Sequence, residues 1–371
     1  MDQSIRWGIW GTGAIANKVA SDIPLAKGAI LHAVASRTEE RARQFALRHR
    51  AAKWYGSLGA MLADADVDAV YVSTPNHRHA GDSIACIEAG KAVLCEKPFA
   101  LNLAQAQQTV DAARRSKVFC MEAMWTRFIP AVIEAKRLID SGAIGPVRLI
   151  QGNFGFIAPE GSKPRLFDLA MGGGALMDIG IYPISFAHHL LGAPQSVTGT
   201  TRLGPTGVDL HSAYQLLYPN GALADLWSSF QVQGTNEAFV FGERGMLHLC
   251  TPFYHAHRLI LQTHTVAHSK GNGHPKSAGA SLLGIAEAMG MAPAVKSMRR
   301  RLSPLLALLK RGRVQSFPFA GNGYQFELME VNRCLREKRI ESAVMPLDET
   351  LEVMRTLDAL RSQWGMVFPQ E

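Results

Sequence analysis

Cysteine, charged side chains and long apolar runs are all scarce in this 371-residue chain. Its five cysteines are odd in number and far apart, which excludes the disulfide framework of a small secreted domain. No stretch of about 18 residues is apolar and free of charge throughout, so no membrane-spanning helix is evident. The first strand-like segment begins at Ile5, which leaves no room for a signal peptide. We therefore expect a soluble cytoplasmic protein with free, buried thiols.

Acidic side chains are nearly absent from residues 270–313, which hold nine basic residues and a single acid, Glu287. The other 30 basic and 30 acidic residues balance, so the net charge of +8 belongs to this segment and a nucleic-acid-binding protein is not indicated. Residues 268–316 have the character of an insertion, and 281–313 contains two helix-like stretches. We expect a helical lid or dimer arm there, with contact to an anionic membrane surface, an acidic partner or a phosphorylated substrate as alternatives.

The length predicts two domains, and 47% hydrophobic residues are enough for two cores. An apolar run at 5–11 leads into the sequence G-T-G-A-I-A at 11–16, in which Ala14 and Ile15 are also candidate cofactor-binding residues, and residues 17–23 have helical character. This strand, glycine turn and helix is typical of a dinucleotide-binding fold. Gly11 would make the tight turn and Gly13 would let the backbone approach a pyrophosphate.

The second strand, 29–35, ends in Ser36 and Arg37, where an NAD-binding chain normally has an acid for the ribose 2′-hydroxyl. An arginine there favours a 2′-phosphate, so Arg37 and Arg41 predict NADP, with NAD as the alternative. The other interpretation is a pair of ordinary surface arginines.

Strands and helices then alternate, which predicts a parallel, doubly wound α/β sheet with ligands at the carboxyl ends of its strands. Strands are expected at 69–73, 92–95 and 118–121, and helices at 77–89 and 103–115. Candidate cofactor-binding residues follow two of these strands: Thr74, Pro75, Asn76, His77, Glu96 and Lys97. Lys97 follows the apolar run at 92–95 in the sequence AVLCEKPF. Partial desolvation beside a nicotinamide would suit this lysine to proton transfer.

After residue 122 the pattern changes to α+β, so we expect a cofactor domain at 1–122 and a second domain at 123–371. A helix at 130–141 precedes hairpin-linked strands, which imply a large, mostly antiparallel sheet. Helices are expected at 322–339, against the sheet domain, and at 348–364, near the cofactor domain. Strands are expected at 147–156, 196–201, 213–218, 222–232, 238–241, 246–250 and 258–266.

The sequence GGGALMDIGIY at 172–182 suggests a flexible glycine loop followed by a helix that carries Asp178 and Tyr182 on one face, four residues apart. The alternative is that Asp178 only caps the helix and that Tyr182 only packs against its neighbours.

Four ordered segments carry a family resemblance: the glycine turn, CEKP, MEAMWTRF at 121–128 and GGGALMDIGIY. With this order and spacing the chain resembles the family of glucose–fructose oxidoreductase, inositol dehydrogenase and the MocA rhizopine proteins. Within it, the chain is most similar to the dimeric dihydrodiol dehydrogenases, which also act as NADP-dependent D-xylose dehydrogenases.

The resemblance implies that Lys97 is catalytic, with Asp178 and Tyr182 facing it across the cleft between the domains. It implies a substrate pocket lined by Trp125, Arg127, Phe128 and Phe154, together with Asp178 and Tyr182. It also implies a homodimer or higher homo-oligomer.

The expected reaction is hydride transfer between NADP and a carbinol carbon of a sugar, polyol or cyclic diol. No metal is expected. Tyr182 would hydrogen-bond the reacting oxygen, with Lys97 lowering the pKa of Tyr182 or taking the proton itself. The alternatives are a cofactor-binding sensor of the same fold and an NAD-dependent glycoside-cleaving enzyme.

Overall fold

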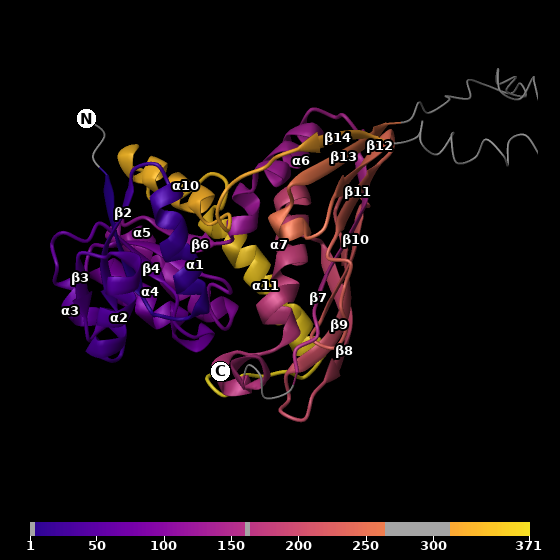
Figure 1. Cartoon of the computed structure of the whole chain (residues 1–371). Helices are drawn as coiled ribbons and strands as arrows, with labels where there is room; N and C mark the ends of the chain where they lie inside the picture. Colours follow the sequence, from indigo (N-terminus) through magenta and orange to yellow (C-terminus); the bar gives the residue numbers. More distant parts are fainter. Residues whose placement is uncertain (1–3, 160–163, 264–311) are drawn as a thin grey trace, which may run out of the picture.

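The computed structural model describes residues 4–159, 164–263 and 312–371. It consists of two sheets, with the amino-terminal sheet at one end of the molecule and the larger sheet at the other (Figure 1). Most of the segment expected to be a basic insertion, 268–316, lies outside the described residues. Its described end is part of the fold, because Arg313–Ser316 forms a strand of the second sheet that pairs with Arg258–Thr263.

The first sheet has six parallel strands in the order β3-β2-β1-β4-β5-β6, which is the doubly wound dinucleotide-binding topology. The strands β4, β5 and β6 are buried along their whole length, as a sheet covered on both faces requires. The expected α/β fold is confirmed. The sequence interpretation did not resolve the edge of this sheet at residues 39–62. The elements are β1 Ile5–Trp10, α1 Ala14–Asp22, β2 Ala29–Ala35, α2 Glu39–His49, β3 Lys53–Tyr55, α3 Leu58–Leu62, β4 Ala69–Val72, α4 His79–Glu88, β5 Ala92–Glu96, α5 Leu103–Ser116 and β6 Cys120–Ala123.

The second sheet has eight strands, and all neighbouring pairs are antiparallel except β7 and β10. Along β9 the side chains alternate between buried and exposed, so one face packs in the core and the other points outward. The elements are α6 Pro130–Asp140, β7 Val147–Gly155, α7 Ile181–Leu191, β8 Ser196–Leu203, β9 Asp209–Leu217, β10 Leu223–Ser229, β11 Ala238–Gly242, β12 Gly245–Leu249, β13 Arg258–Thr263, β14 Arg313–Ser316, α10 Gln325–Arg336 and α11 Leu347–Gln363.

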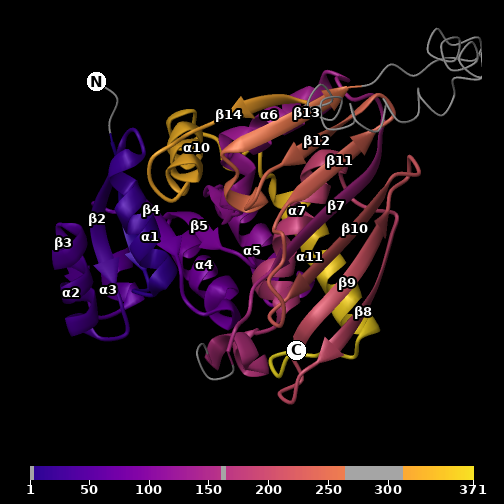
Figure 2. The ribbon, with the colours of Figure 1, turned by 45° about the vertical axis from the view of Figure 1, so that its right-hand side comes forward.

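Helices α6, α7 and α11 cover the inner face of this sheet, whereas the opposite face carries no described helix (Figure 2). The helical turns Leu169–Leu191 are long and apolar enough to cross a membrane, but 78% of their most apolar window is buried within the protein. This is the pattern of a core helix in a folded domain.

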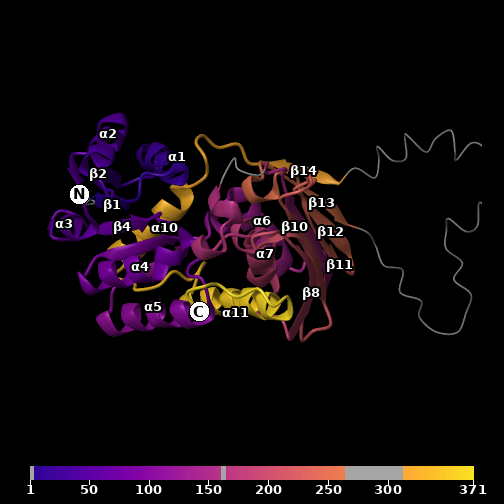
Figure 3. The same ribbon diagram turned by 90° about the horizontal axis from the view of Figure 1, so that it is seen from below.

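The carboxyl-terminal helices connect the two domains. As expected, α11 runs beside α5 of the cofactor domain, and it also contacts α7 and β8 (Figure 3). The prediction that residues 322–339 pack against the second sheet is wrong, because α10 packs on the cofactor domain. There Asn332 accepts a hydrogen bond from the Trp7 indole at 3.1 Å. The helical period of residues 322–339 shows that one face is buried, but it does not show that Asn332 on that face pairs with Trp7 of the cofactor domain.

Burial of Glu122 on β6 gives the fold a defined pH dependence. Burial raises the pKa of Glu122 to about 7, and its Oε1 accepts a hydrogen bond from the Phe99 N–H at 3.2 Å. Because its pKa in the folded state is raised, this carboxyl favours folding at low pH. Its contribution is complete below its unfolded pKa of about 4.5 and is lost as pH rises through about 7.

We therefore predict that Glu122→Gln, which keeps an acceptor for Phe99, gains stability relative to the wild type as pH rises. Between pH 5 and pH 8.5 the difference in free energy of unfolding should grow by about 2–3 kcal/mol. Urea unfolding of both proteins at the two pH values measures it. A difference that is the same at both would contradict a neutral Glu122 in the fold.

Candidate active site

A cleft of about 670 Å³ opens where the carboxyl ends of β1, β2, β4 and β5 meet the second domain. The glycine turn forms one end of it. Gly11 has a φ of +110°, and a Cβ there would lie 2.8 Å from the Ser73 carbonyl oxygen, so only glycine fits. A Cβ on Gly13 would meet nothing within 4 Å, which leaves the backbone open to a ligand.

The residues around this turn fit a dinucleotide. Helix α1 starts at Ala14 without a side-chain cap, so its first N–H groups are available for a pyrophosphate. Ala14, Ile15, Ser36, Arg37 and Arg41 all line the same cleft. Both arginines are exposed, and neither has an ion pair with another described residue. Two unpaired guanidinium groups beside the ribose position suit a phosphate substituent.

The segment after β4 is fixed to both domains. Both ring nitrogens of His79 face carbonyl oxygens, those of Thr74 at 2.8 Å and Pro98 at 2.7 Å. The Asn76 amide donates to the Gly172 carbonyl of the second domain at 2.9 Å. His77 also lines the cleft, and burial lowers its pKa. Thr74, Pro75, Asn76 and His77 are therefore brought together with the glycine turn, as the sequence predicts.

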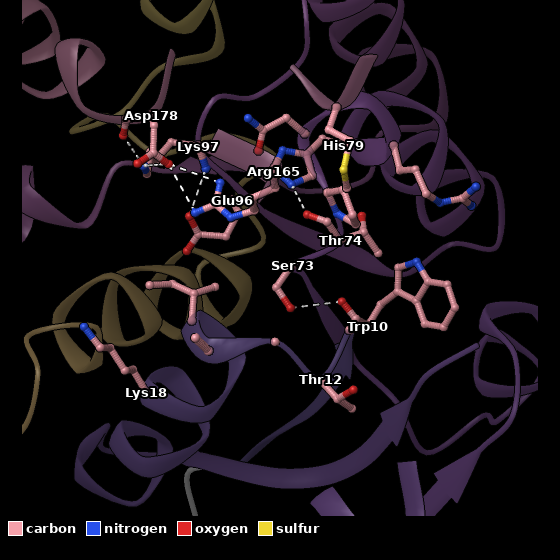
Figure 4. A pocket seen from close by; sticks show the side chains of 18 of the residues that line it. Trp10, Thr12, Lys18, Ser73, Thr74, His79, Glu96, Lys97, Arg165 and Asp178 are labelled. Carbon is pink, nitrogen blue, oxygen red and sulfur yellow. Dashed lines mark hydrogen bonds and ion pairs between the residues drawn. The ribbon is translucent and has the colours of Figure 1, made fainter. Parts of the chain in front are cut away.

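Lys97 lies at the junction of the two domains, with its side chain 10% exposed (Figure 4). Its ammonium donates to the Asp178 backbone carbonyl at 2.5 Å and lies 3.8 Å from Asp178 Oδ1. The preceding Glu96 is buried and accepts hydrogen bonds from the Tyr71 hydroxyl and the Lys97 N–H. Burial raises the pKa of Glu96. This carboxyl anchors the end of β5 and leaves the lysine at the surface of the cleft.

Tyr182 is held by aromatic neighbours. Its hydroxyl accepts a hydrogen bond from the Trp125 indole at 3.1 Å, and the Lys97 ammonium lies over its ring, 4.7 Å from the centroid. Burial, and then the negative charge of Glu96, raise the pKa of Tyr182 well above its usual value. The net shift of the Tyr182 pKa is therefore upward, whereas the sequence interpretation had Lys97 lowering this pKa or taking the proton itself. Because the hydroxyl already accepts from Trp125, its own proton is available to donate into the cleft.

The glycine-rich segment differs from its predicted form in two respects. Leu176–Gly180 is a π-helical turn, so Asp178 precedes the regular helix α7 that carries Tyr182. The three glycines allow close packing rather than flexibility. A Cβ on Gly172 would lie 2.4 Å from the Leu101 side chain, and one on Gly173 would lie 2.7 Å from the Leu166 carbonyl oxygen.

Two residues predicted for the substrate pocket lie elsewhere. Arg127 is buried, forms an ion pair with Glu349 at 2.7 Å and donates to Ser185, while Phe128 packs in the core. Neither is among the described residues that line the cleft. Of the helical turn Trp125–Phe128, only Trp125 is among the described residues that line the cleft. Phe154 lines the cleft as expected.

Sequence reasoning missed several residues of the cleft because they come from distant segments. Tyr254 stacks on Phe154 with ring centroids 4.1 Å apart. Tyr324 reaches Trp125 from the loop before α10, because buried Asp22 accepts hydrogen bonds from the Asn322 and Tyr324 N–H groups. The other missed lining residues include Lys18, Phe156 and Arg165.

Potential metal ligands come together away from the cleft. In the described part of the chain His32, Asp64 and Asp66 form such a group. The Lys53 ammonium bonds both aspartates at 3.1 and 3.2 Å, so a cationic side chain already pairs with them. Among the histidines between residues 248 and 274, His248 pairs with Glu237, and residues 264, 268 and 274 lie outside the described residues.

A doubly wound sheet with an open glycine turn, beside a lysine, an aspartate and a tyrosine, defines a nicotinamide-dependent oxidoreductase. The chain belongs to the oxidoreductase family with an NAD-binding Rossmann fold, whose model matches residues 5–124. The model of the GFO/IDH/MocA C-terminal domain matches residues 132–248. Both matches confirm the resemblance inferred from the sequence.

Relatives and structures agree with this assignment. The chain is 32% identical to trans-1,2-dihydrobenzene-1,2-diol dehydrogenase of Mus musculus and 31% identical to that of Homo sapiens, each over 99% of both chains. Its fold is similar to that of an aldose-aldose oxidoreductase from Caulobacter crescentus, with a TM-score of 0.78 and 24% identity over 98% of both chains. A 3-ketoreductase from Actinomadura kijaniata in complex with NADP superposes with a TM-score of 0.73 and 23% identity over 97% of both chains.

Proposed function

We propose that this protein transfers a hydride between NADP and a carbinol carbon of a cyclic diol or a sugar ring. The observation that carries the proposal is the position of Lys97, Asp178 and Tyr182 around one end of a dinucleotide cleft. The nicotinamide supplies the hydride acceptor or donor. The protein supplies the groups that hold the reacting oxygen and move its proton.

We infer that Lys97 and Tyr182 divide these roles, and the geometry of both side chains supports this. The neutral phenol of Tyr182 donates a hydrogen bond to the reacting oxygen, because its burial disfavours the phenolate. Lys97, whose ammonium contacts Asp178 and the Tyr182 ring, transfers the proton. Removal of the Tyr182 hydroxyl should therefore slow the reaction less than replacement of Lys97.

Aromatic walls support a ring-shaped substrate. Besides Trp10 beside the glycine turn, six aromatic side chains line the cleft and offer flat apolar faces to a ligand. A cyclic diol or the apolar face of a sugar ring fits such walls. The aromatic residues are Trp125, Phe154, Phe156, Tyr182, Tyr254 and Tyr324. The names of the curated relatives support the same substrate class. A screen of dihydrodiols, sugars and inositols with NADP and NAD, monitored by the absorbance of the reduced nicotinamide, tests this substrate class directly.

Lys97→Met should lower kcat by about 10²–10⁴-fold, the usual contribution of a general acid or base. Tyr182→Phe should lower kcat by a smaller factor, because it removes one hydrogen bond to the reacting oxygen. Steady-state kinetics with the best substrate measure both, and fluorescence titration with NADPH should show that each variant still binds cofactor. Near-normal turnover of both variants would rule out this site.

We propose NADP as the preferred cofactor because Arg37 and Arg41 have no partner among the described residues and line the cleft. Arg37→Asp should lower the ratio of kcat/KM for NADP over that for NAD by about tenfold or more, since a hydrogen bond to a charged group contributes about 1.5–3 kcal/mol. Arg48→Asp, on the exposed surface of α2, is the matched control. An unchanged ratio for Arg37→Asp would exclude it from cofactor selection.

We further propose that the protein acts in the cytoplasm as a homodimer, formed through the outer face of the second sheet. All five cysteines are buried and free, which suits a reducing compartment. On the outer face Leu217 and Leu223 are cross-strand neighbours with 37% and 46% of their surface exposed. Phe239 and His248 stack on the same sheet with ring centroids 4.2 Å apart.

Replacing both Leu217 and Leu223 with Glu should convert the dimer to a monomer, because two charges would be buried in the interface. Light scattering on a size-exclusion column measures the mass. Leu47→Glu, at an even more exposed leucine on α2, should leave the mass unchanged. A wild-type monomer, or a double variant of unchanged mass, would refute this interface.

A further inference from the structure

Arg165 enters the cleft from the short helical turn Pro164–Phe167 and contacts the aspartate beside the catalytic lysine. Its Nη1 and Nη2 atoms each lie 3.2 Å from Asp178 Oδ1 (Figure 4). The same oxygen lies 3.8 Å from the Lys97 ammonium. Two cations therefore approach one carboxylate oxygen, while Oδ2 has no hydrogen bond to a described residue.

The backbone around Arg165 is fixed rather than loosely attached. Gly174 N donates to the Leu166 carbonyl at 2.9 Å, and Gly173 N donates to the Asp168 carbonyl at 3.0 Å. A Cβ on Gly173 would lie 2.9 Å from the Arg165 carbonyl oxygen. The triple glycine thus allows the loop before Asp178 to lie directly on the turn that carries Arg165.

This arrangement decides which oxygen of Asp178 faces the substrate. Without Arg165, the nearest cation is Lys97, and the carboxylate would be free to rotate and pair with the ammonium through both oxygens. That pairing would occupy the acceptor and restrain the lysine. With Arg165 bound to Oδ1, the carboxylate is held in one rotamer and Oδ2 stays available as a charged acceptor.

We propose that Arg165 is a positioning residue that orients Asp178 to accept a hydrogen bond from a second hydroxyl, next to the carbon that is oxidised. This inference rests on the proposed function and narrows it to vicinal diols, including the adjacent hydroxyls of a sugar ring. The first hydroxyl lies between Tyr182 and Lys97, and the second meets Asp178 Oδ2. Recognition then requires both hydroxyls, since a missing one leaves a charged acceptor unpaired.

The test compares cyclohexane-1,2-diol with cyclohexanol, which lacks the second hydroxyl, in the wild type, Arg165→Gln and Arg165→Lys. The wild type should prefer the diol. Arg165→Gln should lower kcat/KM for the diol by about 10–100-fold, the equivalent of one charge-assisted hydrogen bond, and change that for cyclohexanol by less than about threefold. Arg165→Lys should restore part of the preference because it keeps the charge.

Two further variants separate positioning from a general structural effect. If Arg165 acts through Asp178, Arg165→Gln should cause no further loss of diol preference in a protein that already carries Asp178→Asn. Arg137→Gln removes an exposed arginine paired with Glu134 far from the cleft and should leave both substrates unaffected.

The outcomes distinguish the inference from the proposed function. A wild type that oxidises no diol or sugar in the earlier screen would overturn both. A wild type that oxidises diols, together with an Arg165→Gln variant that keeps the full preference over cyclohexanol, would overturn the inference alone. Equal losses for the two substrates, or additive losses with Asp178→Asn, would likewise show that Arg165 does not position the aspartate.

Discussion

The hydrogen bond from the Lys97 ammonium to the Asp178 carbonyl joins the two domains at the reacting end of the cleft. The cleft depends on that contact, because the glycine turn that lines it belongs to one domain and most of its aromatic walls belong to the other. A second hydrogen bond, from Asn76 to the Gly172 carbonyl, fixes the same junction from the neighbouring strand end. Helix α11, packed on α5 and on α7, holds the domains together on the side away from the opening.

Behind Lys97 lies a group of buried acids that a globular core would normally exclude. Glu96 and Glu327 are both almost inaccessible, and burial raises the pKa of each, well above its usual value for Glu327. The neutral form of Glu327 avoids a second negative charge beside Glu96. Helix α10, which carries Glu327, is therefore part of the support of the site although it is more than 200 residues from Lys97. Its position against the cofactor domain follows from this packing.

The parts that sequence predicts well are those in which neighbouring residues decide the geometry. The strand, glycine turn and helix at residues 5–22 are specified by local conformation, since Gly11 needs a positive φ and α1 begins directly after it. Lys97 is placed by the end of β5. Arg127 and Phe128 were misplaced because successive residues of a helical turn point in different directions, and one sequence does not show which of them faces the cleft. Tyr254, Tyr324 and Arg165 come from segments that only tertiary packing brings near Lys97.

The chemistry of the cleft follows from the uneven distribution of its polar atoms. Its aromatic walls bind any flat ring without selecting a stereochemistry, so selection must come from the few directed groups at one end. Lys97 and Tyr182 address a single oxygen, and that oxygen alone does not distinguish a diol from a simple alcohol. The carboxylate of Asp178 adds a second point of contact, and the direction of its free oxygen is set by Arg165. In the proposed mechanism, a charged acceptor at a fixed distance from the reacting oxygen converts a general dehydrogenase geometry into one that selects a pair of adjacent hydroxyls.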